Sequence, residues 1–337
     1  MLPVSGSQST YGAVQTFWGH LSMTTSAPTV KRALILSGGG GRGAYQVGVW
    51  RRLQEIGWQP DIVCGTSIGS INGALIGSGW DAEQLEAFWA SLDRKHAFRV
   101  SLWRRIKYRI NRVLGRHPNF PALLDNEPLR QTLAEAIDVA RLRDDQPRVT
   151  VAATNVCRAR LEYFAGEQLT VDHILASCSI PVVFPWCEIA GELYWDGGVM
   201  ANTPIFPALN AGATEILVVL LAPLVGEPVA PPKTTRAAFS WAFDIITIGS
   251  AASLLQELAS HLGLDLRARR DTLTSQHFLD LGDIRIGVVA PKTAWGIDSI
   301  LDLDRQHIRQ RIGAGYDDAT EQLSGFLQQA RGEQPSV

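Results

Sequence analysis

Short apolar runs alternate with helical repeats along the chain from residue 32 onward. The run RALILS at 32–37 predicts a strand, and apolar residues spaced as on one helix face predict a helix over 43–56 that stops at Gly57. The pattern then repeats, with DIVCGTS at 61–67 predicting a second strand and 68–76 a second helix. This alternation is typical of an α/β protein, in which helices pack on a sheet.

The rest of the chain continues this pattern with shorter signals. β-branched and aromatic runs predict further strands at 149–156, 162–165, 192–195, 216–221 and 284–289, and helical spacing predicts a final helix from 304 to about 329.

The segments that connect these elements predict the domain organisation. A proline-rich stretch at 222–235 predicts a loop before a helical segment at 237–262. We expect a flexible leader over residues 1–30, a core over 31–222 with an insertion near 94–120, and a C-terminal part over 223–337 that completes the same domain.

Composition limits the kinds of function. Hydrophobic residues make up 46% and charged residues 19% of the 337, as in a globular protein with a large core. The 31 Lys and Arg nearly balance the 33 Asp and Glu, so the chain as a whole has no electrostatic footprint for nucleic acid. The most apolar stretch, 241–262, contains Asp244, Gln256 and Glu257, which excludes a membrane-spanning helix there.

The cysteines and the N-terminus bear on the compartment. The four cysteines form no CxxC pair and sit in apolar stretches, which favours buried, reduced thiols at Cys64, Cys157, Cys178 and Cys187. The N-terminal segment lacks the basic-then-apolar order of a signal peptide. We therefore expect a cytoplasmic protein.

A glycine-rich loop, GGGGRG at 38–43, joins the first predicted strand to its helix. Such a loop can cradle a phosphate, bind a dinucleotide or hold the oxyanion of an acyl transfer. The loop matches the dinucleotide pattern GxGxxG, but the acidic residue of that pattern should end the next strand, and Asp61 precedes it. A Walker loop is excluded because no Gly-Lys-Ser/Thr follows.

The second predicted strand supplies the partner that acyl transfer needs. GTSIG at 65–69 matches GxSxG, the pattern of a serine nucleophile on a sharp turn between strand and helix. Gly65 and Gly69 would leave room for this nucleophile elbow, and Ser67 would project its hydroxyl above the sheet. An oxyanion could be held by the backbone N–H groups of Gly39, Gly40 and Gly41, where losing one donor costs about 3–4 kcal/mol.

The serine proton needs an acceptor, and Asp196 is the candidate base. It follows the strand predicted at 192–195 and precedes two glycines, so a turn would leave its carboxylate at the edge of the sheet. With an ordinary pKa of about 4, the carboxylate would have to be desolvated and within hydrogen-bonding reach of Ser67. None of the seven histidines lies in a turn of small residues that would mark a catalytic loop.

Three ordered motifs, GGGGRG at 38–43, GTSIG at 65–69 and DGG at 196–198, resemble those of the patatin-like phospholipases. Further likenesses to the family are ASCSIPVVFP at 176–185, NTP at 202–204 and, as in bacterial members, GYDDA at 315–319.

The resemblance implies a three-layer α/β/α sandwich with a mainly parallel central sheet, a helical insertion and a helical C-terminal part. It also implies hydrolysis of carboxylic esters of membrane lipids through an acyl-enzyme, without a metal or organic cofactor. Ser67 would be the nucleophile, Asp196 the base, and the backbone of Gly39, Gly40, Gly41 and Arg42 the oxyanion hole. Ser37 stands where plant members have an aspartate, a position that varies among bacterial relatives.

Residues 94–120 hold nine Lys or Arg and no Asp or Glu. Apolar residues at helical spacing line one side, as in a helix that lies on an anionic lipid surface. An amphipathic helix docked on the core would show the same pattern. We hypothesise that this segment contacts the inner face of a membrane through Trp103, Arg104, Arg105, Lys107, Arg109 and Arg112.

Two other functions fit parts of the sequence. A Ser-His-Asp esterase of the α/β-hydrolase type would need His277 or His307 to complete a triad, but that fold usually builds more sheet before its nucleophile than precedes Ser67. A non-catalytic module would use the glycine loop and the basic segment to bind membranes or nucleotides. The motifs do not specify the physiological lipid, the acyl position or the oligomeric state.

Overall fold

Strand β1 (Arg32–Leu36) lies inside the sheet, as its run of apolar residues requires. In the computed structural model it pairs in parallel with β2 (Ile62–Thr66) on one side and with β7 (Glu215–Val219) on the other. β3 (Arg148–Asn155) continues the parallel sheet beyond β2, and β9 (Arg285–Val289) continues it beyond β7. The carboxyl ends of these five strands therefore share one edge, where open α/β sheets bind their ligands.

The structure describes residues 30–100, 122–144, 146–224, 231–234 and 277–330, together with the single positions 106, 110, 113, 114 and 238. The predicted leader and the helical segment predicted at 237–262 lie outside the described residues, apart from Val30 and Ala238. The six residues of the predicted membrane contact, from Trp103 to Arg112, lie outside them as well.

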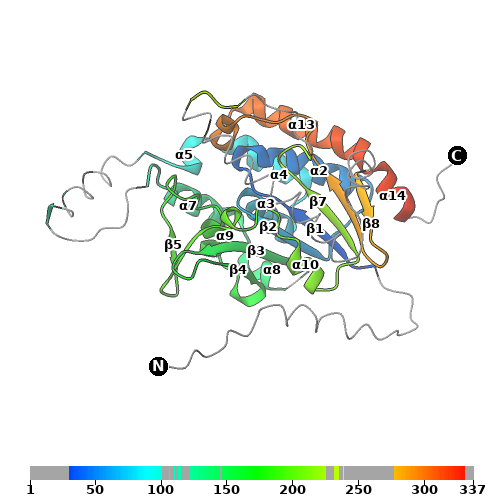
Figure 1. Ribbon diagram of the computed structural model, residues 1–337, viewed down its shortest axis with the longest axis horizontal. Coiled ribbons are helices and arrows are strands. Elements are labelled where there is room, and N and C mark those ends of the chain that lie inside the picture. Colours follow the sequence, from blue (N-terminus) through cyan, green and yellow to red (C-terminus); the bar gives the residue numbers. More distant parts are fainter. Residues whose placement is uncertain are drawn as a thin grey trace, which may run out of the picture. The chain divides into compact units, whose positions relative to one another are not determined.

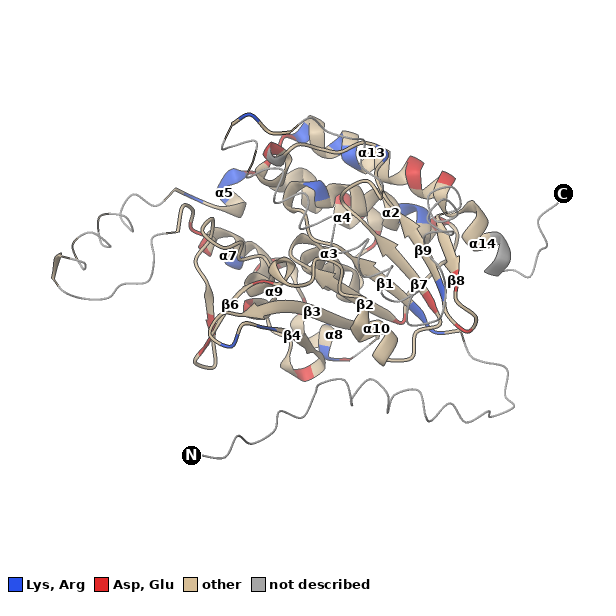
Figure 2. Ribbon diagram, viewed as in Figure 1, with Lys and Arg blue, Asp and Glu red and all other residues tan. Residues whose placement is uncertain are grey.

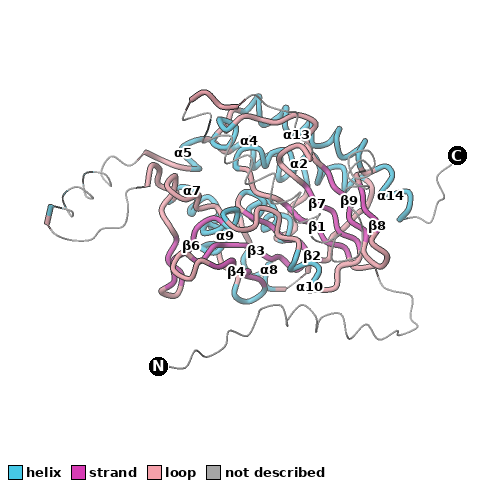
Figure 3. The backbone as a smooth tube through the Cα atoms, viewed as in Figure 1, coloured by secondary structure: helices cyan, strands magenta, loops and turns pink. Residues whose placement is uncertain are grey.

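Antiparallel strands flank the parallel centre. β4 (Arg160–Ala165) and β6 (Glu192–Asp196) both pair with β3, β5 (Cys187–Ile189) pairs with β6, and β8 (Phe278–Asp280) pairs with β9. Within the described residues the nine strands form one sheet in the order β5-β6-β3-β2-β1-β7-β9-β8, with β4 on β3 (Figure 3). The predicted sheet is thus parallel at its centre and mixed at its sides.

Helices fill the connections between the strands. The α-helices are α2 (Ala44–Glu55), α3 (Ile68–Gly77), α4 (Ala82–Ser91), α5 (Arg94–Ala97), α7 (Glu127–Ala136), α8 (Val139–Arg143), α9 (Val171–Ser177), α10 (Phe206–Asn210), α13 (Arg305–Gln322) and α14 (Ser324–Ala330). Short 3-10 turns are η2 (Gly40–Gly43), η3 (Gly166–Gln168), η4 (Gly197–Val199) and η5 (Ile297–Leu301).

The two faces of the sheet carry separate cores. Leu34 and Leu36 of β1 face the larger core, which they share with α2, α3, α4 and α13. Ala33 and Ile35 face the other side, where they share a core with Ala208 of α10. In Figure 1, α10 lies on the opposite side of the sheet from α2, α4 and α13. Alternating side chains of one strand thus bury against helices on both faces, which confirms the predicted three-layer α/β/α arrangement.

The strand and helix predictions agree with the structure within a few residues. Each strand predicted from the sequence is present, and Gly57 follows α2 with a φ of 69°, a left-handed conformation that suits glycine. The helix predicted from 304 to about 329 is divided at Leu323 into α13 and α14.

Two findings concern the cysteines and the membrane. Cys64 and Cys178 are buried free thiols, as predicted, but the prediction was wrong for Cys157, which is exposed in the turn between β3 and β4, and Cys187 is only partly buried. Among the described residues, the helices are all too short or too polar to cross a bilayer.

Candidate active site

Ser67 occupies a strained turn between β2 and α3. Its backbone has φ 54° and ψ −127°, a conformation that L-residues rarely adopt and that clusters at functional sites. A Cβ on Gly65 would lie 2.3 Å from the Gly69 carbonyl oxygen, and a Cβ on Gly69 would lie 2.1 Å from the Leu36 oxygen. The two glycines of the motif therefore allow the backbones to approach and hold Ser67 in this turn.

Asp196 lies at the end of β6, beside Ser67. Its side chain is buried, with 5% of the residue exposed, and its carboxylate accepts the Gly198 N–H at 2.7 Å. The Ser67 side chain lies close enough to this carboxyl to lower its pKa. The structure thus brings together the two residues that the sequence proposed as nucleophile and base.

Burial sets the protonation of this carboxyl. Loss of solvent raises the pKa of Asp196 from 3.8 to about 7, although the nearby Ser67 side chain and the hydrogen bond from the Gly198 N–H act in the opposite direction. A carboxylate whose pKa lies near neutrality is a much better proton acceptor than an ordinary aspartate, since general bases work best near the operating pH. The desolvation that the sequence interpretation required is therefore present.

Two serines, one at the end of α9 and one just after it, position both candidate catalytic residues. The Ser177 hydroxyl accepts the Ser67 N–H at 2.9 Å, and the Ser179 carbonyl accepts the Asp196 N–H at 2.9 Å. The sequence placed this segment near the aspartate but gave no role to these two residues. The role of Ser177 depends on a contact across more than 100 positions, although the small polar residues of ASCSIP were a signal for both serines.

The glycine loop 38–43 passes along the edge of the sheet next to Ser67. The Arg42 N–H donates to the Gly39 carbonyl at 3.3 Å, so this predicted donor is already used within the loop. Among the described residues, the N–H groups of Gly39, Gly40 and Gly41 have no hydrogen-bond acceptor. These three remain the candidate oxyanion donors, and an acyl oxygen near Ser67 would supply an acceptor.

A buried polar network fixes the loop to α3. Asn72 donates to the Gly43 carbonyl at 3.0 Å and to Gln46 at 2.8 Å, while Gln46 donates to the Ser37 carbonyl at 2.8 Å. The Trp89 indole completes the network with a 3.0 Å bond to Asn72. Buried side chains thereby hold both ends of the glycine loop, which preorganises its N–H groups.

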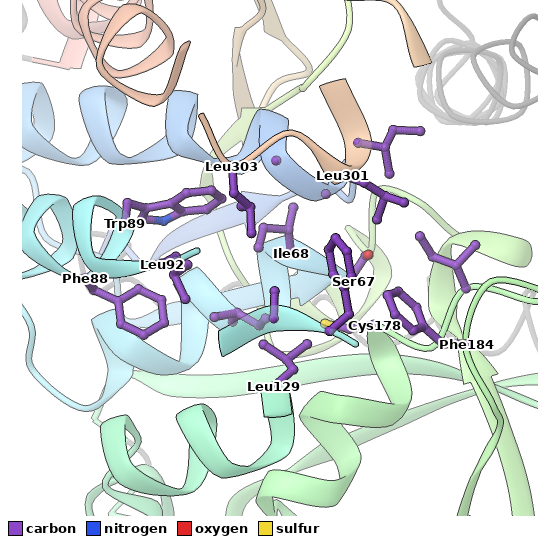
Figure 4. A pocket seen from close by; sticks show the side chains of 17 residues that line it. Ser67, Ile68, Phe88, Trp89, Leu92, Leu129, Cys178, Phe184, Leu301 and Leu303 are labelled. Atoms are coloured by element: carbon purple, nitrogen blue, oxygen red, sulfur yellow. The ribbon is translucent and has the colours of Figure 1, made fainter. Parts of the chain in front are cut away.

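An apolar pocket extends from Ser67. It encloses about 670 Å³ of empty space, part of it open to solvent. Figure 4 shows Ser67 beside Cys178 and Phe184 at one end and Phe88 and Leu92 at the other. The lining residues are Gly40, Gly41, Ser67, Ile68, Ile71, Phe88, Trp89, Leu92, Ala97, Phe98, Leu129, Cys178, Ile180, Phe184, Ile300, Leu301 and Leu303. Such a lining suits a hydrocarbon chain.

The two histidines of the alternative triad lie in other settings. His307 is on the surface, with 55% of its side chain exposed, and its Nδ1 pairs with Asp302 at 2.7 Å. His277 precedes the outermost strand, β8, and its carbonyl accepts the Val288 N–H at 2.7 Å. Within the described part of the chain, Ser67 and Asp196 form their hydrogen bonds without a histidine.

The chain belongs to the patatin-like phospholipase family. The family's sequence model, described as patatin-like phospholipase, matches residues 34–209, just over half of the 337. The matched range begins in β1 and includes the glycine loop, Ser67 and Asp196. The family resemblance stated from the motifs is confirmed.

Proteins of similar sequence are found in fungi and bacteria. Lysophospholipase nte1 of Aspergillus niger is 29% identical over 187 residues, which cover 55% of this chain and 11% of that protein. The cGAMP-activated phospholipase of Vibrio cholerae serotype O1 is 27% identical over 210 residues, which cover 53% of this chain and 57% of that protein. The chain therefore matches a small part of the fungal protein and just over half of the bacterial one.

Solved structures of low sequence identity were also found. Human GIVD cytosolic phospholipase A2 is 11% identical, with a TM-score of 0.47 and coverage of 89% of this chain and 62% of that chain. VipD from Legionella pneumophila is 15% identical, with a TM-score of 0.43 and coverage of 88% and 67%. Both TM-scores are below 0.5, so the fold assignment rests on the sheet topology itself.

Proposed function

We propose that this protein hydrolyses carboxylic esters of membrane lipids with Ser67 as nucleophile and Asp196 as base. The observation that carries the proposal is the strained Ser67 turn beside the buried Asp196 carboxyl, next to a pocket lined by apolar side chains. Family membership and the names of the relatives, lysophospholipase and phospholipase, support the same reaction class.

The reaction would proceed in two halves. The Ser67 oxygen attacks the ester carbonyl carbon while Asp196 accepts its proton, and the carbonyl oxygen becomes an oxyanion facing the N–H groups of the glycine loop. The intermediate collapses to an acyl-enzyme, and Asp196 returns the proton to the departing alcohol. Water then attacks the acyl group with Asp196 again as base, which releases the fatty acid and restores the Ser67 hydroxyl.

The substrate class follows from the pocket. An acyl chain of a lipid would lie among the side chains between Ser67 and Phe88, and these offer apolar contact along the way (Figure 4). The polar remainder of the lipid would stay at the open side. We therefore propose a lipid with a long acyl chain, and leave its headgroup open.

The experiment that tests this function is fatty-acid release from mixed phospholipid and lysophospholipid vesicles by the wild type and Ser67→Ala. Release by the wild type that the variant reduces at least about 1,000-fold is expected for a covalent nucleophile. Equal release by both proteins, or none by the wild type, contradicts the proposal.

We further propose that the basic segment at 94–120 brings the protein to an anionic membrane surface. Ala97 and Phe98 at the start of this segment line the pocket, whereas the apolar residues described after them are exposed, namely Val100, Ile106, Ile110, Val113 and Leu114. Exposed apolar residues among nine Lys and Arg suit the boundary of an anionic bilayer.

The test of this contact is vesicle binding at several salt concentrations. Replacing Arg104, Arg105, Arg109 and Arg112 by Gln is expected to weaken binding to vesicles rich in anionic lipid. The matched control replaces four exposed arginines of α8 and α13 by Gln, namely Arg141, Arg143, Arg305 and Arg309. Equal binding by the two variants contradicts the proposed contact, because both lose the same charge.

A Ser-His-Asp esterase and a non-catalytic module explain less. The triad would need a histidine at Asp196, whose carboxylate accepts the Gly198 N–H and lies within reach of the Ser67 side chain. The module gives no reason for a strained serine beside a desolvated carboxylate, an arrangement that costs stability and that enzymes use.

A further inference from the structure

The C-terminal helix α13 reaches back to the glycine loop. Arg311 of this helix is buried, with 6% of the residue exposed, and its Nη1 donates to the Gly41 carbonyl at 3.1 Å. The same nitrogen donates to the Asp302 carbonyl at 3.2 Å, and Nη2 pairs with the Asp302 carboxylate at 2.6 Å. One guanidinium therefore joins the candidate oxyanion loop to the segment that precedes α13.

Asp302 is held ionised for this contact. Burial acts to raise its pKa, but hydrogen bonds from the Asp304 N–H, Arg311 and His307 outweigh burial, so the pKa of Asp302 lies below its ordinary value. The guanidinium thus retains a charged partner across the neutral pH range, and the fork geometry of arginine uses two of its nitrogens at once.

Glycines fix the position of α13 against α2. A Cβ on Gly48 of α2 would lie 1.9 Å from the Ile312 oxygen, and a Cβ on Gly315 of α13 would lie 2.0 Å from the Tyr45 oxygen. The Tyr45 hydroxyl also donates to Asp318 at 3.0 Å. With the backbones in direct contact, α13 cannot slide along α2, and Arg311 is therefore kept at the level of Gly41.

The charge distribution of α13 is opposite to the one its own dipole favours. Arg305, Arg309 and Arg311 lie in its first half and Asp317, Asp318 and Glu321 in its second half (Figure 2). Isolated helices gain stability from acidic residues near the N-terminus and basic residues near the C-terminus. Tertiary contacts therefore account better for Arg311 than local helix stability does.

The other end of the loop is tethered as well. The Gly38 N–H donates to the Asn202 carbonyl at 3.2 Å, and the Asn202 side chain donates to the Gly38 carbonyl at 3.3 Å. Asn202 fixes the start of the loop and Arg311 fixes Gly41 near its end. The three candidate oxyanion donors lie on the residues between and including Gly39 and Gly41.

We propose that Arg311 is a positioning residue, which clamps the Gly41 carbonyl so that the N–H groups of the glycine loop stay aimed at the developing oxyanion. The inference rests on the proposed hydrolysis and adds a part of the site beyond residues 34–209, the range that the family model matches. Without the clamp the backbone at Gly41 can rotate, since glycine offers little resistance to rotation, and the Gly40–Gly41 peptide that carries the Gly41 N–H can turn with it. The oxyanion would then be stabilised less, while substrate binding in the pocket would continue.

The test compares Arg311→Met with Arg309→Met, an exposed arginine of the same helix. Steady-state hydrolysis of a soluble p-nitrophenyl ester is measured at 25 °C, after thermal melting has shown that each protein is folded. The expected result is a fall in kcat of at least about 10-fold for Arg311→Met with KM within twofold, against about 100-fold or more for loss of a whole donor. The rate of fluorophosphonate labelling should fall in parallel, and Arg309→Met should match the wild type.

Further variants keep the proposal falsifiable if Arg311→Met does not fold. Asp302→Asn leaves the guanidinium in place but removes its charged partner, and should lower kcat less than Arg311→Met, while Arg311→Lys should restore part of kcat. A folded Arg311→Met, or an Asp302→Asn, with the kcat of the wild type overturns the clamp. A wild type that hydrolyses no ester instead overturns the proposed function, so the two failures are distinct.

Discussion

The Ser177 hydroxyl accepts a hydrogen bond from the Ser67 N–H at 2.9 Å, and so supports the strained turn of the candidate nucleophile from a different part of the chain. Ser177 ends α9, and two residues later the Ser179 carbonyl accepts the Asp196 N–H. One short segment therefore sets the relative position of Ser67 and Asp196.

Replacing Ser177 by Ala should lower both stability and turnover. The buried Ser67 N–H would lose its acceptor, which costs about 1–3 kcal/mol of unfolding free energy. The Ser67 hydroxyl would then be displaced, which should reduce kcat at least about 10-fold. The matched control is Ser78→Ala, since the Ser78 hydroxyl accepts the Asp138 N–H at 3.2 Å away from the site. Urea unfolding and ester hydrolysis should show a stability loss in both variants and a kcat loss in Ser177→Ala alone. An unchanged kcat in that variant would remove the positioning role.

The pH dependence of hydrolysis should follow Asp196. Its pKa is raised to about 7, and it must be deprotonated to accept the serine proton. We expect kcat/KM to rise about 10-fold per pH unit below 7 and to level off above it, because this ratio reports the free enzyme. Stopped assays with a soluble ester between pH 5 and 9 measure the curve. A midpoint near 4 would mean that the carboxyl is not desolvated in the active enzyme.

The same carboxyl should make the free energy of unfolding fall as pH rises, whereas the activity rises. In the unfolded chain it ionises near 4 but in the folded chain near 7, so the folded state holds the proton longer and Asp196 makes folding less favourable as pH rises through this window. Asn at this position does not titrate. The stability of Asp196→Asn relative to the wild type should therefore grow between pH 4 and 7, to an order of magnitude of 4 kcal/mol at about 1.4 kcal/mol per pKa unit.

Urea unfolding of both proteins at pH 4.5, 6 and 8 measures this difference. Effects of other ionisable groups cancel in the comparison, as long as they are unaffected by the substitution. A difference that stays constant with pH would contradict the raised pKa.

Because α13 packs on α2, alanine substitutions at two glycines of α13 should have opposite effects on stability. Gly315→Ala places a Cβ 2.0 Å from the Tyr45 oxygen, and should destabilise the fold by about 3 kcal/mol or more because neither backbone can give way. Gly313→Ala meets no atom within 4 Å, and should stabilise α13 by about 0.5–1 kcal/mol. Thermal melting of the two variants decides the point. If both raise the melting temperature, α13 does not lie on α2 as described.

The candidate catalytic residues could be predicted from the sequence better than the residues that hold them in place. Local patterns were sufficient for β1, β2 and the Ser67 turn, because a buried strand, a glycine motif and a following helix are contiguous in the chain. Helix α4 was missed, although its N-cap Asp81 and Gln84 form a capping box that the sequence displays. The roles of Ser177 and Arg311 could not be predicted, since each depends on a contact with a residue more than 100 positions away.

The glycine loop shows the same limit in its details. Its four glycines were interpreted as a loop that binds a phosphate or holds an oxyanion, and the structure shows that two of them also lie against the C-terminal segment. A Cβ on Gly40 would lie 2.2 Å from the Ile300 oxygen, and one on Gly41 would lie 2.3 Å from the Asp302 oxygen. Part of the glycine content therefore serves contact with the C-terminal segment, in addition to any oxyanion role. The Arg42 donor predicted from the motif is used within the loop, a detail that only the backbone conformation reveals.

The measurement that tests the central claim most directly is the acyl-enzyme burst with a p-nitrophenyl ester, compared among the wild type, Ser67→Ala, Asp196→Asn, His277→Ala and His307→Ala. The account predicts a burst for the wild type and both histidine variants, none for Ser67→Ala, and a burst rate at least about 1,000-fold lower for Asp196→Asn. A folded histidine variant without a burst, or Asp196→Asn with a burst as fast as the wild type, would contradict a Ser67–Asp196 dyad.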